Sequence, residues 1–246
     1  MVLKVCIIIP MYNEEAIAKS SIETILPYLE TLPYSTTLLI VNDGSKDRTV
    51  EIVRVMVDKV GDKSRFTMVS HNRNQGYGAG LRTGMRYAID NGYDYALFMD
   101  SDLTNHPKYL TLFYDKMTQG CEYIKATRYT KGGGMEGVAF KRRMFSRIGN
   151  MVGGFLFQLP LTDVTNGFRA VKAEILKQLH LKENGFPIIM EELCQAKRLA
   201  RSFCEVPYIL TDRKAGQGDT HFPYTLRTMV TYLCYALIAF FYGRPK

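Results

Sequence analysis

The apolar run at residues 95–99 stops abruptly at Asp100 and Asp102, and this junction limits the folds that are open to the chain. A short apolar run between polar segments is typical of a buried strand. The two carboxylates then lie at the C-terminal end of that strand, where open α/β sheets bind their ligands. Carboxylates this close repel each other unless a cation such as Mg²⁺ or Mn²⁺ neutralises them, and these ions usually bridge to substrate phosphates. The alternative is a polar turn in which Asp102 caps the next helix.

The N-terminal half of the chain alternates between strand-like and helix-like segments. Apolar runs at residues 5–9, 37–41 and 66–70 precede the run at 95–99, and they are separated by helical stretches at 16–29, at 49–60 and up to Ala88. This alternation predicts an α/β fold with a doubly wound, mostly parallel sheet. Polar residues follow each strand, so we expect one edge of the sheet to carry the site.

The charge balance is basic, because 32 Lys+Arg against 24 Asp+Glu give a net charge of +8. A positive surface favours phosphates, anionic lipid head groups or nucleic acid. The length of 246 residues and the hydrophobic share of 46% are those of one large globular domain.

The cysteines are odd in number, scattered, and never form a CxxC pair, which argues against a disulfide framework and a zinc site. We therefore expect reduced thiols in a cytosolic protein. The N-terminus has no cleavage-site pattern of a signal peptide. No apolar run reaches the roughly 18 to 20 residues that a membrane-spanning helix needs. The cysteines are Cys6, Cys121, Cys194, Cys204 and Cys234.

The glycines Gly76, Gly78 and Gly80 form a spacing that is similar to part of a dinucleotide-binding fingerprint. The loop follows the third strand rather than the first, so the indication of NAD binding is weak. We prefer the alternative that these glycines let the start of a helix lie close to the sheet or to a ligand.

Four motifs follow successive strands of the predicted sheet: Pro10-x-Tyr12-Asn13-Glu14, Asn42-Asp43-Gly44-Ser45, Asn74-x-Gly76-x-Gly78 and Asp100-x-Asp102. In this order they resemble the family 2 glycosyltransferases of the GT-A fold. The resemblance implies a nucleotide pocket, a sugar nucleotide held by Asp100 beside Ser101, and a metal ion on the diphosphate held by Asp102. It further implies that Pro10, Tyr12 and Glu14 line the pocket, that Asp43 binds the base or ribose, and that Gln75 and Gly76 border the nucleotide.

The second half of the chain is similar to the polyprenyl-phosphate sugar transferases of the dolichol-phosphate mannose synthase type. The similarity lies in Arg128, Arg142-x-x-x-Ser146, the Asp163 to Gly-Phe-Arg169 segment, and Gly185 to Glu191. In that family the acceptor is a lipid monophosphate, and arginines suit it because guanidinium groups bind phosphate oxygens bidentately. The resemblance thus implies acceptor-phosphate contacts from Arg128, Arg142, Arg143 and Arg169.

The acceptor decides whether the reaction needs a base. A phosphomonoester is mostly ionised at neutral pH and can attack directly, with inversion at the anomeric carbon, whereas a sugar hydroxyl needs a general base. For a hydroxyl acceptor, Glu191 or Glu192 is the candidate catalytic base, although carboxylates are also favoured in the first turn of a helix.

The C-terminal part departs from the family pattern Arg-x-x-Gly-x-Ser-Lys. It keeps Arg213, which we assign to the nucleotide sugar, and Gly216, but it has Gly218-Asp219 in place of Ser-Lys. Residues 224–242 mix apolar and tyrosine side chains, as interfacial helices do, and a packed core helix is the alternative. We expect a catalytic domain at residues 1–215 and a membrane-proximal helical extension at 216–246, on the cytosolic face of a membrane.

The sequence therefore predicts a metal-dependent glycosyltransferase that moves a sugar from a GDP- or UDP-linked donor to polyprenyl phosphate. Alternatives are extension of a saccharide hydroxyl, nucleotide-sugar synthesis, and a non-catalytic basic module that binds a membrane or nucleic acid. No Gly-rich, Lys/Arg-bearing loop follows the first strand to hold a triphosphate. The set of Asp43, Asp100 and Asp102 argues against the non-catalytic module, and we expect no nucleic-acid partner.

Overall fold

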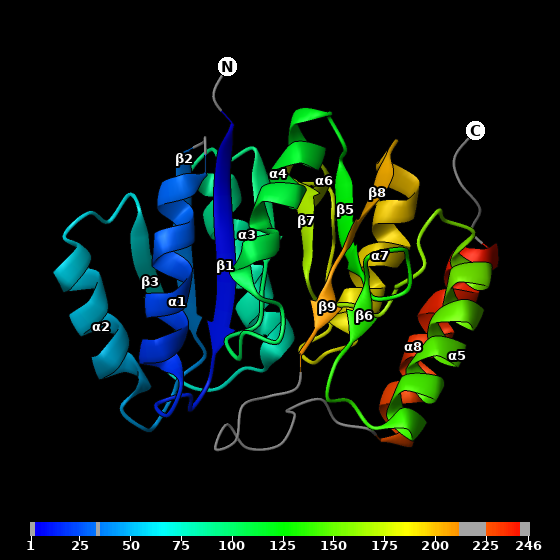
Figure 1. Ribbon diagram of the computed structural model, residues 1–246, viewed down its shortest axis with the longest axis horizontal. Helices are drawn as coiled ribbons and strands as arrows, with labels where there is room; N and C mark the ends of the chain where they lie inside the picture. Colours follow the sequence, from blue (N-terminus) through cyan, green and yellow to red (C-terminus); the bar gives the residue numbers. More distant parts are fainter. Residues whose placement is uncertain (1–2, 33–34, 212–224, 242–246) are drawn as a thin grey trace.

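The computed structural model describes residues 3–32, 35–211 and 225–241 (Figure 1). Its strands are β1 (Lys4–Met11), β2 (Ser35–Asn42), β3 (Phe66–Ser70), β4 (Tyr95–Phe98), β5 (Tyr123–Thr127), β6 (Gly134–Met135), β7 (Arg169–Lys172), β8 (Phe203–Pro207) and β9 (Ile209–Leu210). Its α-helices are α1 (Ala18–Thr31), α2 (Thr49–Val60), α3 (Tyr77–Asp90), α4 (Leu110–Thr118), α5 (Phe140–Phe157), α6 (Ala173–Leu176), α7 (Ile188–Leu199) and α8 (Leu226–Phe241), and a 3₁₀ turn, η1 (Pro107–Tyr109), precedes α4.

The main sheet of the described residues has the strand order β3-β2-β1-β4-β7-β5-β8. Strand β1 runs parallel to β2 and β4, β2 runs parallel to β3, and β5 runs parallel to β8. Strand β7 is antiparallel to both of its neighbours, β4 and β5. The mostly parallel α/β sheet is therefore confirmed. Because β1, β2, β4 and β5 all point the same way, the loops that follow them meet at one edge.

Helices cover both faces of this sheet (Figure 1). Alternate residues of β1 separate the two halves of the core: Ile7 and Ile9 pack with α1, α2 and α4, whereas Cys6 and Ile8 pack with α3 and α7. This alternation follows from the two-residue period of a strand, which sends successive side chains to opposite faces. Residues 5–9 of β1 and Tyr95–Phe98 of β4 are buried on both faces, and both segments consist of hydrophobic residues.

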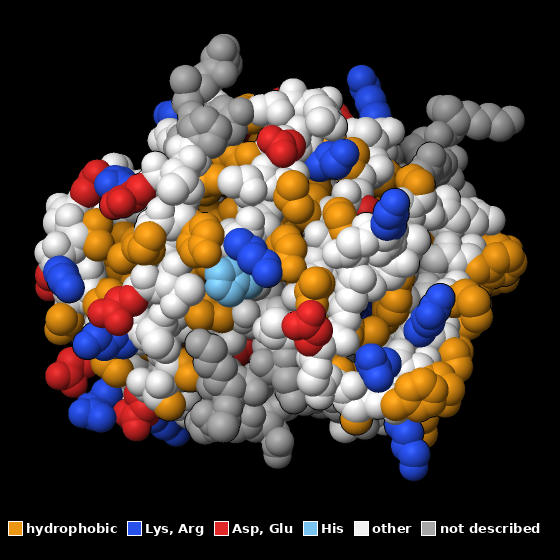
Figure 2. Space-filling view, in the orientation of Figure 1, with side chains coloured by type: hydrophobic (Ala, Val, Ile, Leu, Met, Phe, Trp, Pro, Cys, Tyr) orange, Lys and Arg blue, Asp and Glu red, His pale blue; other side chains and the backbone are white. Residues whose placement is uncertain are grey.

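Helices α5 and α8 lie side by side at one end of the molecule, and α8 also packs on α7 (Figure 1). Helix α8 buries Ala236 and Ala239 against its neighbours, yet both helices leave large apolar side chains exposed. Figure 2 shows hydrophobic side chains beside Lys and Arg at this end. We call this set the α5–α8 apolar surface: Phe140, Met144, Phe145, Ile148, Met151, Val152 and Phe155 of α5, and Leu226, Met229, Val230, Leu233, Leu237, Ile238 and Phe241 of α8.

Among the described residues, no helix is both long enough and apolar enough to cross a membrane. Helix α8, which contains most of the apolar tail, has 16 residues.

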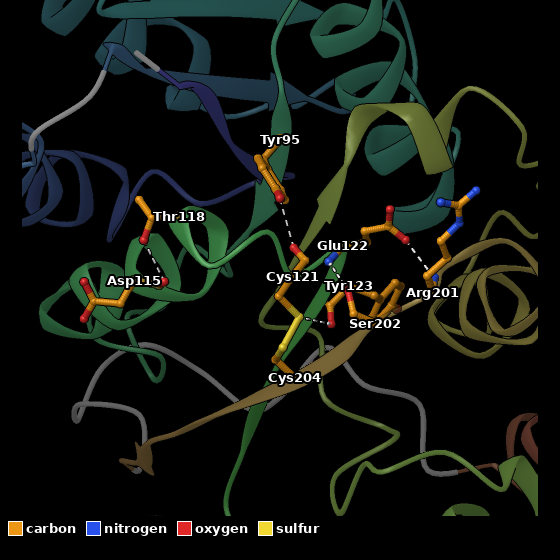
Figure 3. Close-up of a disulfide and its surroundings, with 9 residues drawn as sticks. All are labelled: Tyr95, Asp115, Thr118, Cys121, Glu122, Tyr123, Arg201, Ser202 and Cys204. Atoms are coloured by element: carbon orange, nitrogen blue, oxygen red, sulfur yellow. Dashed lines mark hydrogen bonds between the residues drawn. A yellow bond between two sulfur atoms is a disulfide. The ribbon is translucent and has the colours of Figure 1, made fainter. Parts of the chain in front are cut away.

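The expectation of reduced thiols was wrong for two of the cysteines. Cys121 precedes β5, Cys204 lies in the neighbouring β8, and the two form a disulfide across 83 residues of sequence (Figure 3). Their spacing in the sequence carries no indication of this pairing, because strand order alone brings β8 beside β5. Cys6, Cys194 and Cys234 are free thiols. The disulfide lies at the start of β5, at the edge of the sheet opposite the loops that follow β1, β2 and β4.

Candidate active site

Asp100 and Asp102 lie in the loop that follows β4, as predicted. The Asp100 carboxylate has a neutral donor on each oxygen: Tyr77 Oη lies 3.5 Å from Oδ1, and Asn105 Nδ2 lies 3.3 Å from Oδ2. Asp102 Oδ1 accepts from the backbone N–H of Thr104 at 3.1 Å and from its hydroxyl at 2.8 Å. Asp102 therefore makes a local turn rather than a helix cap.

The next helical element, η1, is capped by another residue. Its cap is His106, whose side chain accepts from the Lys108 N–H. The alternative interpretation of Asp102 as a helix cap is therefore wrong.

The end of β1 meets the end of β4 through Glu14. Ser101 Oγ donates to Glu14 Oε1 at 3.1 Å, and the Glu14 N–H donates to Thr49 Oγ1 at 2.8 Å. Pro10 and Tyr12 are half-buried in the same segment. The structure thus brings together the β1 and β4 motifs that were predicted to line one pocket.

Asp43, at the end of β2, organises the loop that follows β3. Its Oδ1 accepts from the Gln75 N–H at 2.9 Å, and its Oδ2 accepts from the Gly76 N–H at 2.8 Å. His71 Nδ1 lies 2.7 Å from Oδ1, and His71 Nε2 lies 2.8 Å from Thr83 Oγ1. Any contact between Asp43 and a base or ribose would compete with these bonds. This role of His71 has no signal in the sequence, because its partner Asp43 follows a different strand, β2.

The glycine loop packs against a second loop of the protein. The Gly78 N–H donates to the Asn184 carbonyl at 2.7 Å. A Cβ at Gly76 would lie 2.4 Å from that carbonyl oxygen, and one at Gly78 would lie 2.3 Å from the Glu183 carbonyl oxygen. A Cβ at Gly84 would lie 2.4 Å from Ile8 of β1. Close packing therefore explains these glycines, and the dinucleotide fingerprint is not needed.

The carboxylates after β4 fit a divalent ion of the Mg²⁺ or Mn²⁺ type. The described residues contain no group of three or more His, Cys, Asp or Glu side chains that could hold a metal. Mg²⁺ is usually held by one or two carboxylates and by substrate phosphates rather than by a complete protein cage. Asp102, with Asp100 beside it, offers this open set of hard oxygen ligands.

The four arginines predicted to hold an acceptor phosphate have different environments. Arg142 and Arg143 are exposed on α5. Arg128 is bound to Asp163, with Nε 2.6 Å from Oδ2 and Nη2 2.7 Å from Oδ1. Burial alone would lower the pKa of Arg128, but the Asp163 carboxylate outweighs it and raises that pKa above its ordinary value. Arg128 therefore stays charged, and its charge is shared with Asp163.

Arg169 is fully buried, so the structure does not present it to an acceptor phosphate. It forms an ion pair with Glu192, also buried, and its Nη1 donates to the Gly167 carbonyl at 2.8 Å. The sequence shows a cation at position 169 but not the partner on α7 that neutralises it.

Glu191 and Arg213 were also predicted to take part in the reaction. The Glu191 carboxylate is buried and accepts backbone N–H groups of Lys182 at 3.0 Å and Glu183 at 2.9 Å. It holds this loop, and Glu192 is paired with Arg169, so the structure does not favour either of them as a catalytic base. Arg213, Gly216 and the Gly218-Asp219 departure lie outside the described residues.

Comparison with known proteins decides the family. The model of "Glycosyl transferase family 2" matches residues 6–180 of this chain, a span that contains every motif from Pro10 to Arg169. The chain belongs to glycosyl transferase family 2. The carboxylates after β4 are thus those of a glycosyltransferase, and the fold is of the GT-A type.

Two curated relatives of this family 2 member cover most of its length. It is 26% identical over 213 residues to the polyprenol monophosphomannose synthase of Mycolicibacterium smegmatis, covering 85% of this chain and 78% of the relative. It is 29% identical over 230 residues to the dolichol-phosphate mannosyltransferase of Pyrococcus furiosus, covering 90% of this chain but only 62% of the relative.

A solved structure shares the fold of this family 2 member. Glucosyl-3-phosphoglycerate synthase from Mycobacterium tuberculosis, in complex with Mn²⁺, UDP and glucosyl-3-phosphoglycerate, superimposes with a TM-score of 0.67 at 18% identity, over 99% of this chain and 81% of that one.

Proposed function

We propose that this glycosyltransferase moves a sugar from a nucleotide sugar to a polyprenyl phosphate at a membrane surface. Two relatives carry the proposal: a polyprenol monophosphomannose synthase, which matches 85% of this chain, and a dolichol-phosphate mannosyltransferase, which matches 90% of it. Mannose is therefore the first sugar to test, and GDP- and UDP-linked donors should be compared.

The donor end of the site comprises Glu14, Ser101, Asp100 and Asp102. Mg²⁺ or Mn²⁺ held by Asp102 would offset the charge that develops on the diphosphate leaving group. The solved structure of the same fold contains Mn²⁺ and UDP, which is consistent with this assignment. Asp100, held by Tyr77 and Asn105, would orient the sugar nucleotide.

The acceptor phosphate needs no base, because its oxygens are already mostly ionised at neutral pH. A phosphate oxygen forms a bond to the anomeric carbon, the bond from that carbon to the diphosphate oxygen breaks, and the nucleoside diphosphate leaves with the electron pair. The configuration at the anomeric carbon is then inverted. The use of Glu191 as a loop anchor supports this base-free route.

The acceptor phosphate would be bound by Arg142 and Arg143, which are exposed near the start of α5. Arg128 adds a charge that Asp163 partly neutralises.

The α5–α8 apolar surface would rest on the lipid. Neither helix contains an Asp or Glu, whereas α5 carries Lys141, Arg142, Arg143 and Arg147, and α8 carries Arg227. Apolar side chains interspersed with cations match the boundary between acyl chains and anionic head groups. We therefore propose a peripheral protein on the cytosolic face of the membrane, with its acceptor already in the lipid layer.

A partition assay tests the reaction. The protein, Mg²⁺ or Mn²⁺, a radiolabelled nucleotide sugar and a short-chain polyprenyl phosphate are mixed and extracted with organic solvent. Label from GDP-mannose or another donor in the organic phase supports the proposal and identifies the donor. Nucleotide release without labelled lipid would contradict it and point to a hydroxyl acceptor.

A vesicle-flotation assay tests the membrane placement. Phosphatidylcholine vesicles with phosphatidylglycerol should bind the protein, and Phe145→Ser with Phe155→Ser should weaken binding by about tenfold or more, because both apolar side chains leave the lipid. The matched control is Val55→Ser with Leu112→Ser, which alters exposed apolar residues of α2 and α4. Equal binding by both double variants would contradict the placement.

A further inference from the structure

Tyr77 links the Asp100 carboxylate to a stack of aromatic rings. Its ring lies parallel to that of Phe186, with centroids 4.4 Å apart and an interplanar angle of 12°. Its hydroxyl lies 3.5 Å from Asp100 Oδ1. Stacking on Phe186 limits rotation of the Tyr77 ring, so the hydroxyl is held on the Asp100 side.

Phe186 is itself held from α8. Its carbonyl accepts from the Tyr232 hydroxyl at 3.2 Å. Three residues earlier, Glu183 Oε1 accepts from the Tyr235 hydroxyl at 2.9 Å. The loop between them is fastened to the start of α3 by the bond from the Gly78 N–H to the Asn184 carbonyl at 2.7 Å. Contacts therefore run from α8 through this loop to Tyr77 and Asp100.

The Tyr77 hydroxyl is protonated at neutral pH. A tyrosine hydroxyl ordinarily loses its proton only at about pH 10. The hydroxyl can therefore donate to the carboxylate.

Gly167 completes the surroundings of this pair. A Cβ at position 167 would lie 3.4 Å from Tyr77 Oη and 3.8 Å from Asp100 Oδ2. The absence of a side chain at Gly167 keeps the space beside both groups open. This space adjoins the carboxylate that is assigned to the sugar nucleotide.

We propose that Tyr77 is a positioning residue that orients the Asp100 carboxylate toward the sugar nucleotide, and that Phe186 and Tyr232 keep the Tyr77 ring in place. This inference rests on the proposed function. It makes the inner face of α8 part of the support of the donor site, while the outer face of the same helix belongs to the α5–α8 apolar surface.

The test compares Tyr77→Phe with Tyr95→Phe in the full-length protein. Tyr77→Phe removes one hydroxyl and keeps the ring stack. Tyr95→Phe removes a buried hydroxyl that donates to the Cys121 carbonyl at 3.0 Å, at the far end of β4 (Figure 3). We expect Tyr77→Phe to lower kcat/KM for the nucleotide sugar about five- to tenfold, as for one lost hydrogen bond, with the KM for polyprenyl phosphate unchanged. Tyr95→Phe should leave both unchanged.

Tyr232→Phe provides a second test that does not depend on the folding of the first variant. It removes the bond to the Phe186 carbonyl, and we expect a smaller loss of kcat/KM in the same direction. In the double variant with Tyr77→Phe the two losses should not add, because Tyr232 acts through the Tyr77 ring.

The inference is overturned if Tyr77→Phe and Tyr95→Phe have the same kinetic constants, or if the losses for Tyr77→Phe and Tyr232→Phe simply add. Failure of the proposed function would show differently. The unaltered protein would then transfer no sugar from any donor to polyprenyl phosphate, which would overturn this inference as well, whereas failure of the positioning role alone leaves wild-type transfer intact.

Discussion

The Arg169 guanidinium and the Glu192 carboxylate form an ion pair from which solvent is excluded, with Nε 2.6 Å from Oε1 and both side chains fully buried. The guanidinium also lies over the Phe98 ring, 4.2 Å from its centroid. Arg169 therefore ties β7 to β4 and α7 behind the site rather than facing a ligand.

Glu192→Gln should destabilise the protein strongly, because it leaves a buried cation without its counter-charge. We expect the free energy of unfolding to fall by about 3–5 kcal/mol, measured by urea denaturation. Arg169→Met combined with Glu192→Leu removes both charges and should cost far less. If Arg169→Met instead raised the KM for polyprenyl phosphate at unchanged stability, Arg169 would belong to the acceptor site after all.

Asp102→Ala should abolish metal-dependent transfer without unfolding the protein. Asp102 is the proposed ligand of the metal ion, and it accepts hydrogen bonds from Thr104 within the same loop. We expect kcat to fall by about a hundredfold or more, as for other lost electrostatic contacts to a developing charge. Asp115→Ala, at an exposed position of α4, is the control for loss of one carboxylate. Retained turnover with Mg²⁺ would disprove the metal assignment.

Arg142→Ala with Arg143→Ala should affect the acceptor far more than the donor. We expect the KM for polyprenyl phosphate to rise about tenfold, because charge-assisted bonds to phosphate are lost, while the KM for the nucleotide sugar stays within about twofold. Lys59→Ala with Lys63→Ala removes the same charge from exposed positions at the end of α2 and just beyond it. An equal rise in both KM values would mean that these arginines do not bind the acceptor.

Reduction of the Cys121–Cys204 disulfide should lower stability but not activity. The disulfide closes a loop of 83 residues, and its loss should lower the free energy of unfolding by about 2–4 kcal/mol. Thermal unfolding with and without reductant, and of Cys121→Ser with Cys204→Ser, measures this. Kinetic constants should be unchanged, because the disulfide lies at the edge of the sheet opposite the site. A serine variant as stable as the oxidised protein would show that the disulfide does not form.

Because of Lys125, the free energy of unfolding should increase as the pH rises from 7 to 9. Burial lowers its pKa from 10.5 to about 7 in the folded protein, where its Nζ donates to the Asn166 carbonyl. Between about pH 7 and pH 10.5, Lys125 is neutral in the folded protein but protonated in the unfolded chain. Raising the pH across this range therefore favours folding. Relative to Lys125→Met, the free energy of unfolding should rise by about 2 kcal/mol across this range in urea titrations. Parallel curves for the two proteins would contradict the lowered pKa.

The fold was largely predictable because hydrophobic periodicity is a local property. The helix at 49–60 and the strand at 66–70 have the predicted bounds, and Asp100 follows a buried strand as expected. Strand β1 continues through Pro10 to Met11, beyond the predicted end at residue 9.

The roles of the charged side chains were less predictable, because a sequence shows a charge but not its partner. Arg142 and Arg169 look alike in sequence, yet Arg142 is exposed on α5 whereas Arg169 is fully buried beside Glu192, 23 residues further on. In the sequence Glu191 is a candidate base, but in the folded chain its carboxylate binds the backbone of the loop at Lys182 and Glu183. Tyr77 gave no signal at all, since its partners Phe186 and Asp100 come from other elements.

The start of α3 is capped in part by another loop of the protein, because the Asn184 carbonyl accepts a hydrogen bond from the Gly78 N–H. A helix N-terminus normally attracts phosphate through its free N–H groups and the positive end of its dipole. Here the N–H of Gly78 is bound internally, so it is not available to the phosphates of an incoming nucleotide. Under the proposed function, the enzyme would then depend on the supply of free divalent cation around it. We expect its rate in a cell to follow that supply. An enzyme whose glycine loop bound the phosphates directly would not depend on the cation in this way.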